Sequence, residues 1–144
     1  VWCQEEYSRG VRDLERELMP AMQAYGLGLL PFFPLASGLL TGKYRRDKPM
    51  PEGARLTNTQ RLADRYLTEA NWAIVAGLQE FCAKRGRSLL ELAFSWLAAR
   101  PAVASVIAGA TKPEQIEQNI AAVRWALTAD DMVEIDRLSG RSAA

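Results

Sequence analysis

The sequence predicts an α/β fold built on a parallel sheet, and three observations carry this prediction. The segment 27–33 is continuously apolar, which is typical of a parallel strand buried on both faces. Apolar residues at helical spacing follow the strand-like segments, in the order βα-βα-(αα)-βα with one further helix. Loops containing glycine and lysine follow two of the strands, and right-handed crossovers bring the carboxyl ends of parallel strands to one rim.

Strand and helix patterns divide the first half of the chain. Residues 1–7 form a predicted short strand, and residues 8–25 form a predicted helix with one apolar face. The second strand covers residues 27–33. Residues 44–58 are polar and rich in Pro, Gly, Arg and Lys, which predicts a long surface loop.

Capping residues and glycines mark the elements of the second half. These are a helix over 69–85, a helix capped by Ser88 that stops before Pro101, a strand over 103–108, a helix over 113–124, a helix opened by Thr128 and a tail over 139–144. Trp72, Trp96 and Trp125 lie at core spacing on helices and are interpreted as structural.

Composition excludes several classes of function. The chain has 144 residues, enough for one domain with a sizeable core, and hydrophobic residues make up 49% of it. The net charge of +1 gives no global field for nucleic acid or a membrane. The mixed run of charges at 45–48 is interpreted as a solvated loop. We find no apolar run long enough to span a bilayer and no signal peptide, and we expect a cytoplasmic protein.

Residue types also limit the chemistry. The chain contains no histidine, which removes the commonest general base and metal ligand. No cluster of cysteines and carboxylates has metal-ligand spacing, so we expect no metal site. Cys3 and Cys82 are interpreted as two buried thiols in a reducing cytosol rather than as a disulfide.

A turn and a helix start follow the strand predicted at 103–108. The apolar run stops at Gly109, Thr111 can cap the next helix, and Pro113 suits its first turn. A helix N-terminus favours an anion, and Lys112 adds a full positive charge. These residues indicate a phosphate site or an ordinary capped helix, and by themselves they do not separate the two.

A second junction of the same kind follows the strand at 27–33. Its loop contains Ser37, Gly38, Gly42 and Lys43, so the backbone can approach a ligand closely and a cation lies beside it. The pattern is neither a Walker P-loop nor a Rossmann fingerprint. Two such junctions in one chain favour a phosphate-bearing ligand more than either does alone.

Two long motifs resemble the C-terminal half of an aldo-keto reductase. They are Phe-Phe-Pro-Leu-Ala-Ser-Gly-Leu-Leu-Thr-Gly-Lys-Tyr over 32–44 and Ile-Ala-Gly-Ala-Thr-Lys-Pro-Glu-Gln-Ile-Glu-Gln-Asn over 107–119. Gln4-Glu-Glu-Tyr-Ser is similar to the sixth barrel strand of that family, which usually reads Gln-x-x-Tyr. The resemblance covers residues 1–138 and implies a partial (β/α)8 TIM barrel: the last three βα units plus extra helices. A complete barrel takes about 250 residues.

The resemblance implies hydride transfer from NADPH to an aldehyde or ketone. In the family a Tyr protonates the developing alkoxide, a nearby Lys and His tune its acidity, an Asp pairs with the Lys, and all four residues belong to the N-terminal half. No position here matches them, so we expect no catalytic residue in this chain and no turnover by it alone. The alternatives are a non-enzymatic NADP-binding regulatory subunit, since the family includes channel-associated beta subunits, and an inactive truncated fragment. The substrate and the oligomeric state stay open.

The resemblance assigns the nicotinamide end of the cofactor to two residues near strand ends. Gln4 matches the residue that bonds the carboxamide, and its alternative is a polar residue at a strand end. Phe32 matches the aromatic that stacks on the ring, and its alternative is a core residue. Phe33 replaces a family serine and can lend only its backbone to the pyrophosphate.

The pyrophosphate and the adenosine are assigned in the same way. The loop that wraps the pyrophosphate matches Pro34, Leu35, Ala36, Ser37 and Gly38, with Lys43 reaching the phosphates. Arg55 resembles the arginine of the segment that folds over the cofactor, or is a solvated surface residue. The adenosine end matches Gly109, Thr111, Lys112, Gln115, Gln118 and Asn119. Thr111 and Lys112 would hold the 2′-phosphate, which favours NADP over NAD. Three amides share one helix face, although Gln118 is open to a purely solvated interpretation.

Overall fold

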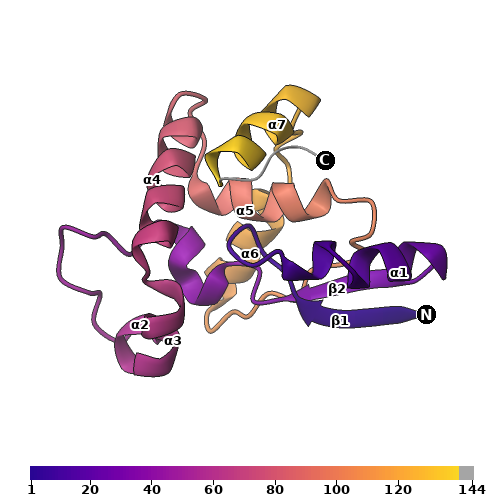
Figure 1. Cartoon of the computed structure of the whole chain (residues 1–144). Helices are drawn as coiled ribbons and strands as arrows, with labels where there is room; N and C mark the ends of the chain where they lie inside the picture. Colours follow the sequence, from indigo (N-terminus) through magenta and orange to yellow (C-terminus); the bar gives the residue numbers. More distant parts are fainter. Residues whose placement is uncertain (140–144) are drawn as a thin grey trace.

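The computed structural model describes residues 1–139. Its elements in chain order are β1 (Trp2–Glu6), the 3-10 helix η1 (Asp13–Glu15), α1 (Leu18–Ala24), β2 (Gly28–Phe32), the 3-10 helix η2 (Ala36–Thr41), α2 (Arg55–Asn58), α3 (Gln60–Tyr66), α4 (Glu69–Ala83), α5 (Leu89–Ala98), α6 (Pro113–Ala122) and α7 (Ala129–Leu138). Figure 1 shows α4, α5 and α7 gathered together, with β1, β2 and α1 extending from them as an arm.

The sheet contains two parallel strands. β1 pairs with β2 in a register that sets Trp2 opposite Gly28 and Glu6 opposite Phe32. This confirms a helix-rich α/β fold with a small parallel sheet. The carboxyl ends of both strands lie at the same end of the sheet, as their parallel direction requires.

The strand predicted at 103–108 is wrong as a regular strand. Leu29 bonds to both Ala102 and Ala104, which makes one isolated parallel bridge between Leu29 and Val103. A regular ladder would continue with a donor from residue 31, but Pro31 has no N–H. Its carbonyl instead accepts from Ile107, at 2.9 Å, one residue beyond the regular register. Proline in β2 therefore ends the ladder, and the third segment runs beside β2 without pairing along its length.

The single helix predicted at 8–25 is also wrong. Ser8 and Val11 form a tight antiparallel bridge, with both backbone bonds at 3.1 Å, and η1 and the short α1 follow. Pro20 is the third residue of α1. Because a proline ring clashes with the carbonyl four residues earlier, one helix cannot run through this position from residue 8. The helix therefore starts just before the proline.

The four later helices confirm the predicted pattern, with α4 and α6 each ending two residues early. Ser88 caps α5 through a capping box, in which Ser88 Oγ accepts from the Glu91 N–H and Glu91 Oε2 accepts from the Ser88 N–H. Thr128 and Asp131 form the same arrangement at the start of α7. Local side-chain bonds of this kind are visible in sequence because they join residues three positions apart.

Ser88→Ala should lower the free energy of unfolding by about 1 kcal/mol, because it removes the acceptor for a helix N–H. Urea denaturation measures the difference. Ser105→Ala, at an exposed position outside the helices, is the matched control and should change stability by less than about 0.5 kcal/mol. Equal effects of the two substitutions would show that the cap contributes nothing.

The loop predicted at 44–58 is partly wrong. Tyr44 and Leu56 are buried, and the Leu56 N–H donates to Tyr44 Oη at 3.0 Å. The last four residues form α2, and α3 follows at once without having been predicted. This segment is therefore held against the protein rather than solvated along its length. The charged run at 45–48 is exposed, as expected.

The apolar core lies between the sheet and the helices and is contributed mainly by η2, α4 and α5. Trp96 is fully buried, whereas Trp72 and Trp125 are half-buried against the core, which supports their structural interpretation.

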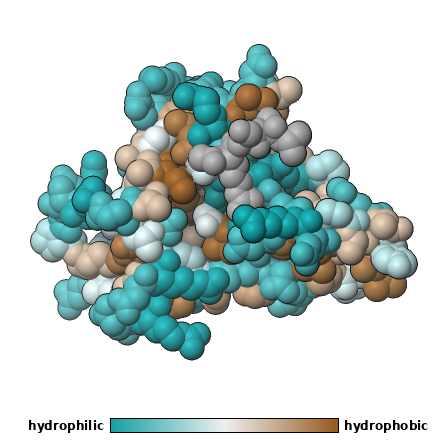
Figure 2. Space-filling view, in the orientation of Figure 1, coloured by the Kyte–Doolittle hydropathy of each residue, from teal (hydrophilic) through white to brown (hydrophobic). Residues whose placement is uncertain are grey.

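Cys82 is buried and Cys3 half-buried, and both are free thiols. Burial raises the pKa of the Cys82 thiol to about 12. The face shown in Figure 2 is mostly hydrophilic, with smaller hydrophobic areas between the polar ones.

A polar cluster joins the first turn of the chain to α7. Arg12 makes a bidentate pair with Glu15, at 2.6 and 2.8 Å, and a second pair with Asp136. The guanidinium groups of Arg9 and Arg100 lie with that of Arg12 around the Trp96 ring, at 4.3 to 5.5 Å from its centre. The predicted tail begins inside this cluster, since Ser139 Oγ accepts from Arg9. Residues 140–144 of that tail lie outside the described residues.

Candidate functional site

Two loops leave the sheet at the carboxyl end of its strands. The Tyr7 N–H donates to the Phe32 carbonyl at 3.4 Å, so the exits of β1 and β2 are adjacent. The bond from Ile107 to Pro31 places the third segment beside the same end. The turns at Gly38 and Gly109, which follow these exits, therefore start from one rim.

The backbone of the first turn is unusual. Phe33, Ala36 and Ser37 have φ values of 52°, 47° and 56°, and Gly38 has 97°. Residues other than glycine seldom adopt positive φ, and such strain collects where ligands bind. Ser37 is 6% exposed, and its Oγ has no hydrogen-bond partner among the described residues. The turn therefore presents a strained backbone and a buried hydroxyl at the rim.

The structure brings Lys43 against this turn, as the motif predicts. A Cβ at position 38 would lie 3.1 Å from Lys43 Cε and 3.3 Å from its Nζ. The ammonium also lies 5.1 Å from the centre of the Tyr44 ring, whose hydroxyl accepts from Leu56. The positive φ favours glycine at 38, a larger residue would displace the Lys43 side chain, and the cation is exposed to solvent beside the turn.

Aromatic side chains stand next to the turn. Phe32 and Phe33 are half-buried and meet edge to face, with 5.3 Å between ring centres. Arg55 is exposed, which is compatible with a solvated surface residue, and its guanidinium lies 5.7 Å from the centre of the Phe33 ring. Phe33 therefore offers a ring for Arg55 as well as the backbone predicted from sequence. Gln4 is exposed in β1, opposite Leu30.

The second turn is open to solvent, and one capping prediction here is wrong. Lys112, not Thr111, is the N-cap of α6, and it makes no side-chain cap bond. The Thr111 N–H and hydroxyl both donate to Gln115 Oε1, at 2.7 and 3.2 Å. The amide of Gln115 reaches back and takes both donors, so the Thr111 hydroxyl does not serve the helix. Pro113 occupies the first helical turn as predicted.

Most of the residues assigned to the adenosine are accessible. Gly109, Thr111, Lys112, Gln115 and Gln118 are exposed, and Asn119 is half-buried. α6 is long enough to present a positive dipole end, with Lys112 beside it. This side of the rim therefore has cationic and amide groups that an anionic ligand can reach.

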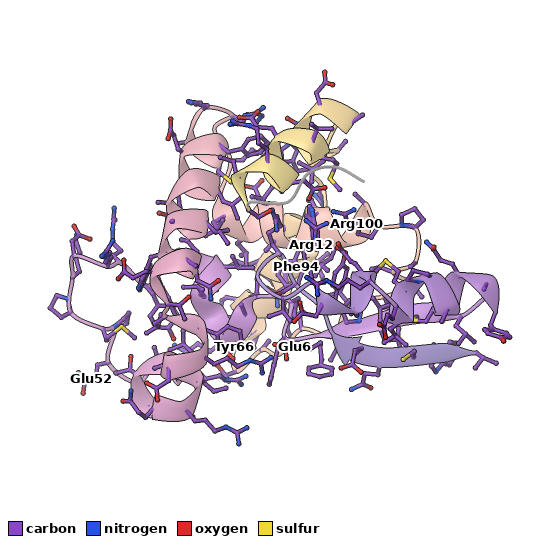
Figure 3. All side chains as sticks on the ribbon, in the orientation of Figure 1. Glu6, Arg12, Glu52, Tyr66, Phe94 and Arg100 are labelled. Carbon is purple, nitrogen blue, oxygen red and sulfur yellow. The ribbon has the colours of Figure 1, made fainter. Side chains whose placement is uncertain are left out.

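A carboxylate at the end of β1 was missed by the sequence analysis. Glu6 Oε2 lies 2.7 Å from Arg65 Nη2, and Glu6 Oε1 accepts a hydrogen bond from Tyr66 Oη. Figure 3 shows Glu6 and Tyr66 side by side at the end of the sheet. Burial first, and then the bond to Glu6, raise the pKa of Tyr66 to about 12. The one signal in the sequence was that Glu6 shares a strand face with Gln4.

A family comparison identifies the chain. The model of the aldo/keto reductase family matches residues 1–139. The chain belongs to this family. Its resemblance to the family, inferred from the two long motifs, is therefore confirmed.

Three relatives show the range of this family. A probable voltage-gated potassium channel subunit beta of Oryza sativa subsp. japonica is 43% identical over 122 residues, which are 83% of this chain and 37% of that protein. An L-glyceraldehyde 3-phosphate reductase of Escherichia coli O157:H7 is 36% identical over 83% of this chain and 36% of its own length. An NADH-specific methylglyoxal reductase of Escherichia coli strain K12 is 32% identical over 89% of this chain and 38% of that protein. The chain spans a little over a third of the length of these relatives.

The rim suits the dinucleotide cofactors of the family. Within residues 1–139 the buried Ser37 hydroxyl has no hydrogen-bond partner, and the Lys43 ammonium lies beside Gly38. Aldo-keto reductases generally use NAD(P)H, whose pyrophosphate needs donors and positive charge at close range.

Among the described residues no group of three or more His, Cys, Asp or Glu could hold a metal ion. None of the described helices is long and apolar enough to cross a membrane.

Proposed function

We propose that the chain forms the cofactor-binding portion of an NADPH-dependent reductase of aldehydes or ketones. The observation that carries this proposal is the common rim: in a chain of this family, the Gly38 and Gly109 turns leave the same end of a parallel sheet. The cofactor supplies the hydride when it is bound. The residues of this chain hold it in place.

The first turn would hold the pyrophosphate. The N–H groups of Ala36 and Gly38 already donate within the turn, so the Ser37 hydroxyl would be its donor to the anion. Because the turn is preorganised, binding would carry little ordering cost. Lys43 adds a charge beside Gly38. Phe32 would pack against the nicotinamide and Gln4 would bond its carboxamide, which leaves one face of the ring free to deliver hydride.

The second turn would hold the 2′-phosphate of NADP. Lys112 is an exposed cation at the N-terminus of α6, and the Thr111 hydroxyl lies next to it. Gln115, Gln118 and Asn119 would face the adenosine from the same helix. A relative named as NADH-specific shows that cofactor preference varies in the family, so this assignment needs a direct test.

Lys112→Met should weaken NADPH binding by about tenfold or more and leave NADH binding nearly unchanged, because only NADPH carries the charge that Lys112 would meet. Fluorescence titration of the full chain with each nucleotide measures both affinities. Lys84→Met, which removes an exposed lysine from the end of α4, is the matched control. Equal changes for the two nucleotides would remove Lys112 from the 2′-phosphate site, and absence of nucleotide binding by the wild type would contradict the proposed function.

We further propose that this chain corresponds to the last three βα units of a (β/α)8 barrel. β1 has no strand partner on its outer edge among residues 1–139, and Trp2, Ile116 and Ile120 are exposed. Exposed apolar groups and open strand edges mark surfaces that contact other protein. Preceding βα units would cover them and would supply the catalytic Tyr, Lys, His and Asp, for which no position in this chain is a match.

A regulatory subunit is the second candidate. The relatives from Oryza sativa subsp. japonica and Arabidopsis thaliana, at 43% and 41% identity, are both named as probable potassium channel subunits beta. Such a protein would use the same rim to bind the nucleotide. Turnover of aldehydes by a polypeptide that contains all eight units would favour the reductase, and nucleotide binding without turnover would favour the regulatory subunit.

A further inference from the structure

Glu6 connects the end of the sheet to a helix far along the chain. Its two carboxylate oxygens accept hydrogen bonds from Arg65 Nη2, at 2.7 Å, and from Tyr66 Oη. These bonds join β1 to the last two residues of α3. The Arg65 guanidinium also lies over the Tyr66 ring, 5.2 Å from its centre. Figure 3 shows how Tyr66 reaches from α3 toward Glu6.

Tyr66 in turn lies against the first turn of the rim. The phenol is 1% exposed, and α3 packs on η2, which contains Ser37 and Gly38. Burial and the bond to Glu6 raise the pKa of Tyr66 to about 12. The phenol therefore stays protonated at neutral pH and keeps its donor for Glu6. The bond from Tyr66 to Glu6 and the packing of α3 on η2 therefore connect the end of β1 to the element that contains the Ser37 turn.

We propose that Glu6 is a positioning residue for the dinucleotide: through Tyr66 it holds the Ser37–Gly38 turn in its strained form and so sets the affinity for the pyrophosphate. This inference rests on the proposed function. Positive φ at Ala36, Ser37 and Gly38 persists only if the surroundings hold it. When its supports are removed, the turn can relax, and the ligand must then order it on binding.

The chemistry of Glu6 fits this role. A carboxylate offers an acceptor oxygen to each of two donors, while an amide in the same place offers one acceptor and has no charge for Arg65. Arg65 also balances the negative charge that Glu6 would otherwise place beside a phosphate site. Tyr66→Phe removes the bond between these two side chains, and Glu6→Gln should weaken the same link, because one amide oxygen must then serve two donors without a charge for Arg65.

The test compares two ligands in the full chain. NADPH carries the pyrophosphate, and 2′-AMP carries the adenine and the 2′-phosphate without it. We expect Glu6→Gln and Tyr66→Phe each to weaken NADPH binding about fivefold or more while leaving 2′-AMP binding unchanged. The double variant should lose little more than Tyr66→Phe alone, because both changes act on one link.

The controls separate positioning from general loss of structure. Glu5→Gln makes the same chemical change one residue earlier, on the opposite face of β1, and should leave both affinities unchanged. Tyr66→Phe keeps the buried ring, and circular dichroism checks that each variant is folded. Equal losses for NADPH and 2′-AMP, or no loss in either variant, would overturn the positioning role alone. If the wild type bound neither ligand, the proposed function and this inference would both fall.

Discussion

Arg12→Met should lower the free energy of unfolding by about 3–5 kcal/mol, because it breaks a buried ion-pair cluster by removing its central cation. Arg12 is 8% exposed and donates to both oxygens of Glu15 and to Asp136. Met fills similar volume, so the loss comes from two carboxylates deprived of this partner in a poorly solvated place. Urea denaturation of the full chain measures the change.

Two further variants decide how the effect is interpreted. Arg16→Met removes an exposed arginine close in the chain and should change stability by no more than about 0.5 kcal/mol. Arg12→Lys keeps the positive charge but loses the planar guanidinium that makes two bonds to Glu15. Its free energy of unfolding should therefore lie between those of the wild type and Arg12→Met. Equal stability of the Arg12 and Arg16 methionine variants would contradict a structural role for the cluster.

The same cluster predicts how stability depends on pH. Burial disfavours the ionised Glu15, but hydrogen bonds from Arg12 and Tyr7 outweigh it and hold the pKa of this carboxyl below its usual range. A depressed pKa stabilises the fold above the unfolded pKa, about 4.3, and this contribution is lost as the pH falls through the lower folded value. The wild type should therefore lose stability as the pH falls from about 4.3, and Arg12→Met should show a shallower dependence. Identical pH profiles would show that Glu15 does not contribute through Arg12.

Local patterns predicted most of the elements in this fold. Caps such as Ser88 and Thr128 act over three residues, so a single sequence reveals them, and the apolar run at 27–33 revealed β2. The helix predicted at 8–25 and the strand predicted at 103–108 were the two larger errors, and each had a local signal against it. Pro20 limits the helix, and Pro31 interrupts the hydrogen bonds between β2 and the third segment. Proline is therefore the residue whose position should have corrected both predictions.

In the candidate site, too, local motifs could be predicted from the sequence, whereas a contact between distant residues could not. The Gly38 and Lys43 turn follows β2, and the Gly109 to Lys112 turn follows a segment predicted as a strand, so the sequence placed both on one rim once a parallel sheet was assumed. The contact between Glu6 and Tyr66 spans 60 positions and depends on α3, which was not predicted. No pattern in a single sequence reports such a pair. Residues proposed to touch a ligand were thus easier to find in the sequence than those proposed to support them.

Gly38→Ala should weaken NADPH binding by about tenfold or more. An alanine at φ 97° costs about 1–2 kcal/mol, and its Cβ would lie 3.1 Å from Lys43 Cε and 3.4 Å from the Tyr44 ring. The turn, the ammonium or both must shift, so the groups proposed to hold the pyrophosphate lose their arrangement. Fluorescence titration measures the affinity, and urea denaturation measures the accompanying loss of stability.

Gly86→Ala is the matched control because it introduces similar backbone strain outside the proposed site. It therefore distinguishes a loss of stability from a loss of nucleotide affinity. Gly86 also has positive φ, 62°, but a Cβ there would meet nothing within 4 Å, and it lies between α4 and α5, outside the proposed site. Both substitutions should cost similar stability, about 1–2 kcal/mol, while only Gly38→Ala should lose affinity. If both variants kept the wild-type affinity for NADPH, the Gly38 turn would not be the pyrophosphate site, because a displaced Lys43 and a rebuilt turn could not leave that contact unchanged.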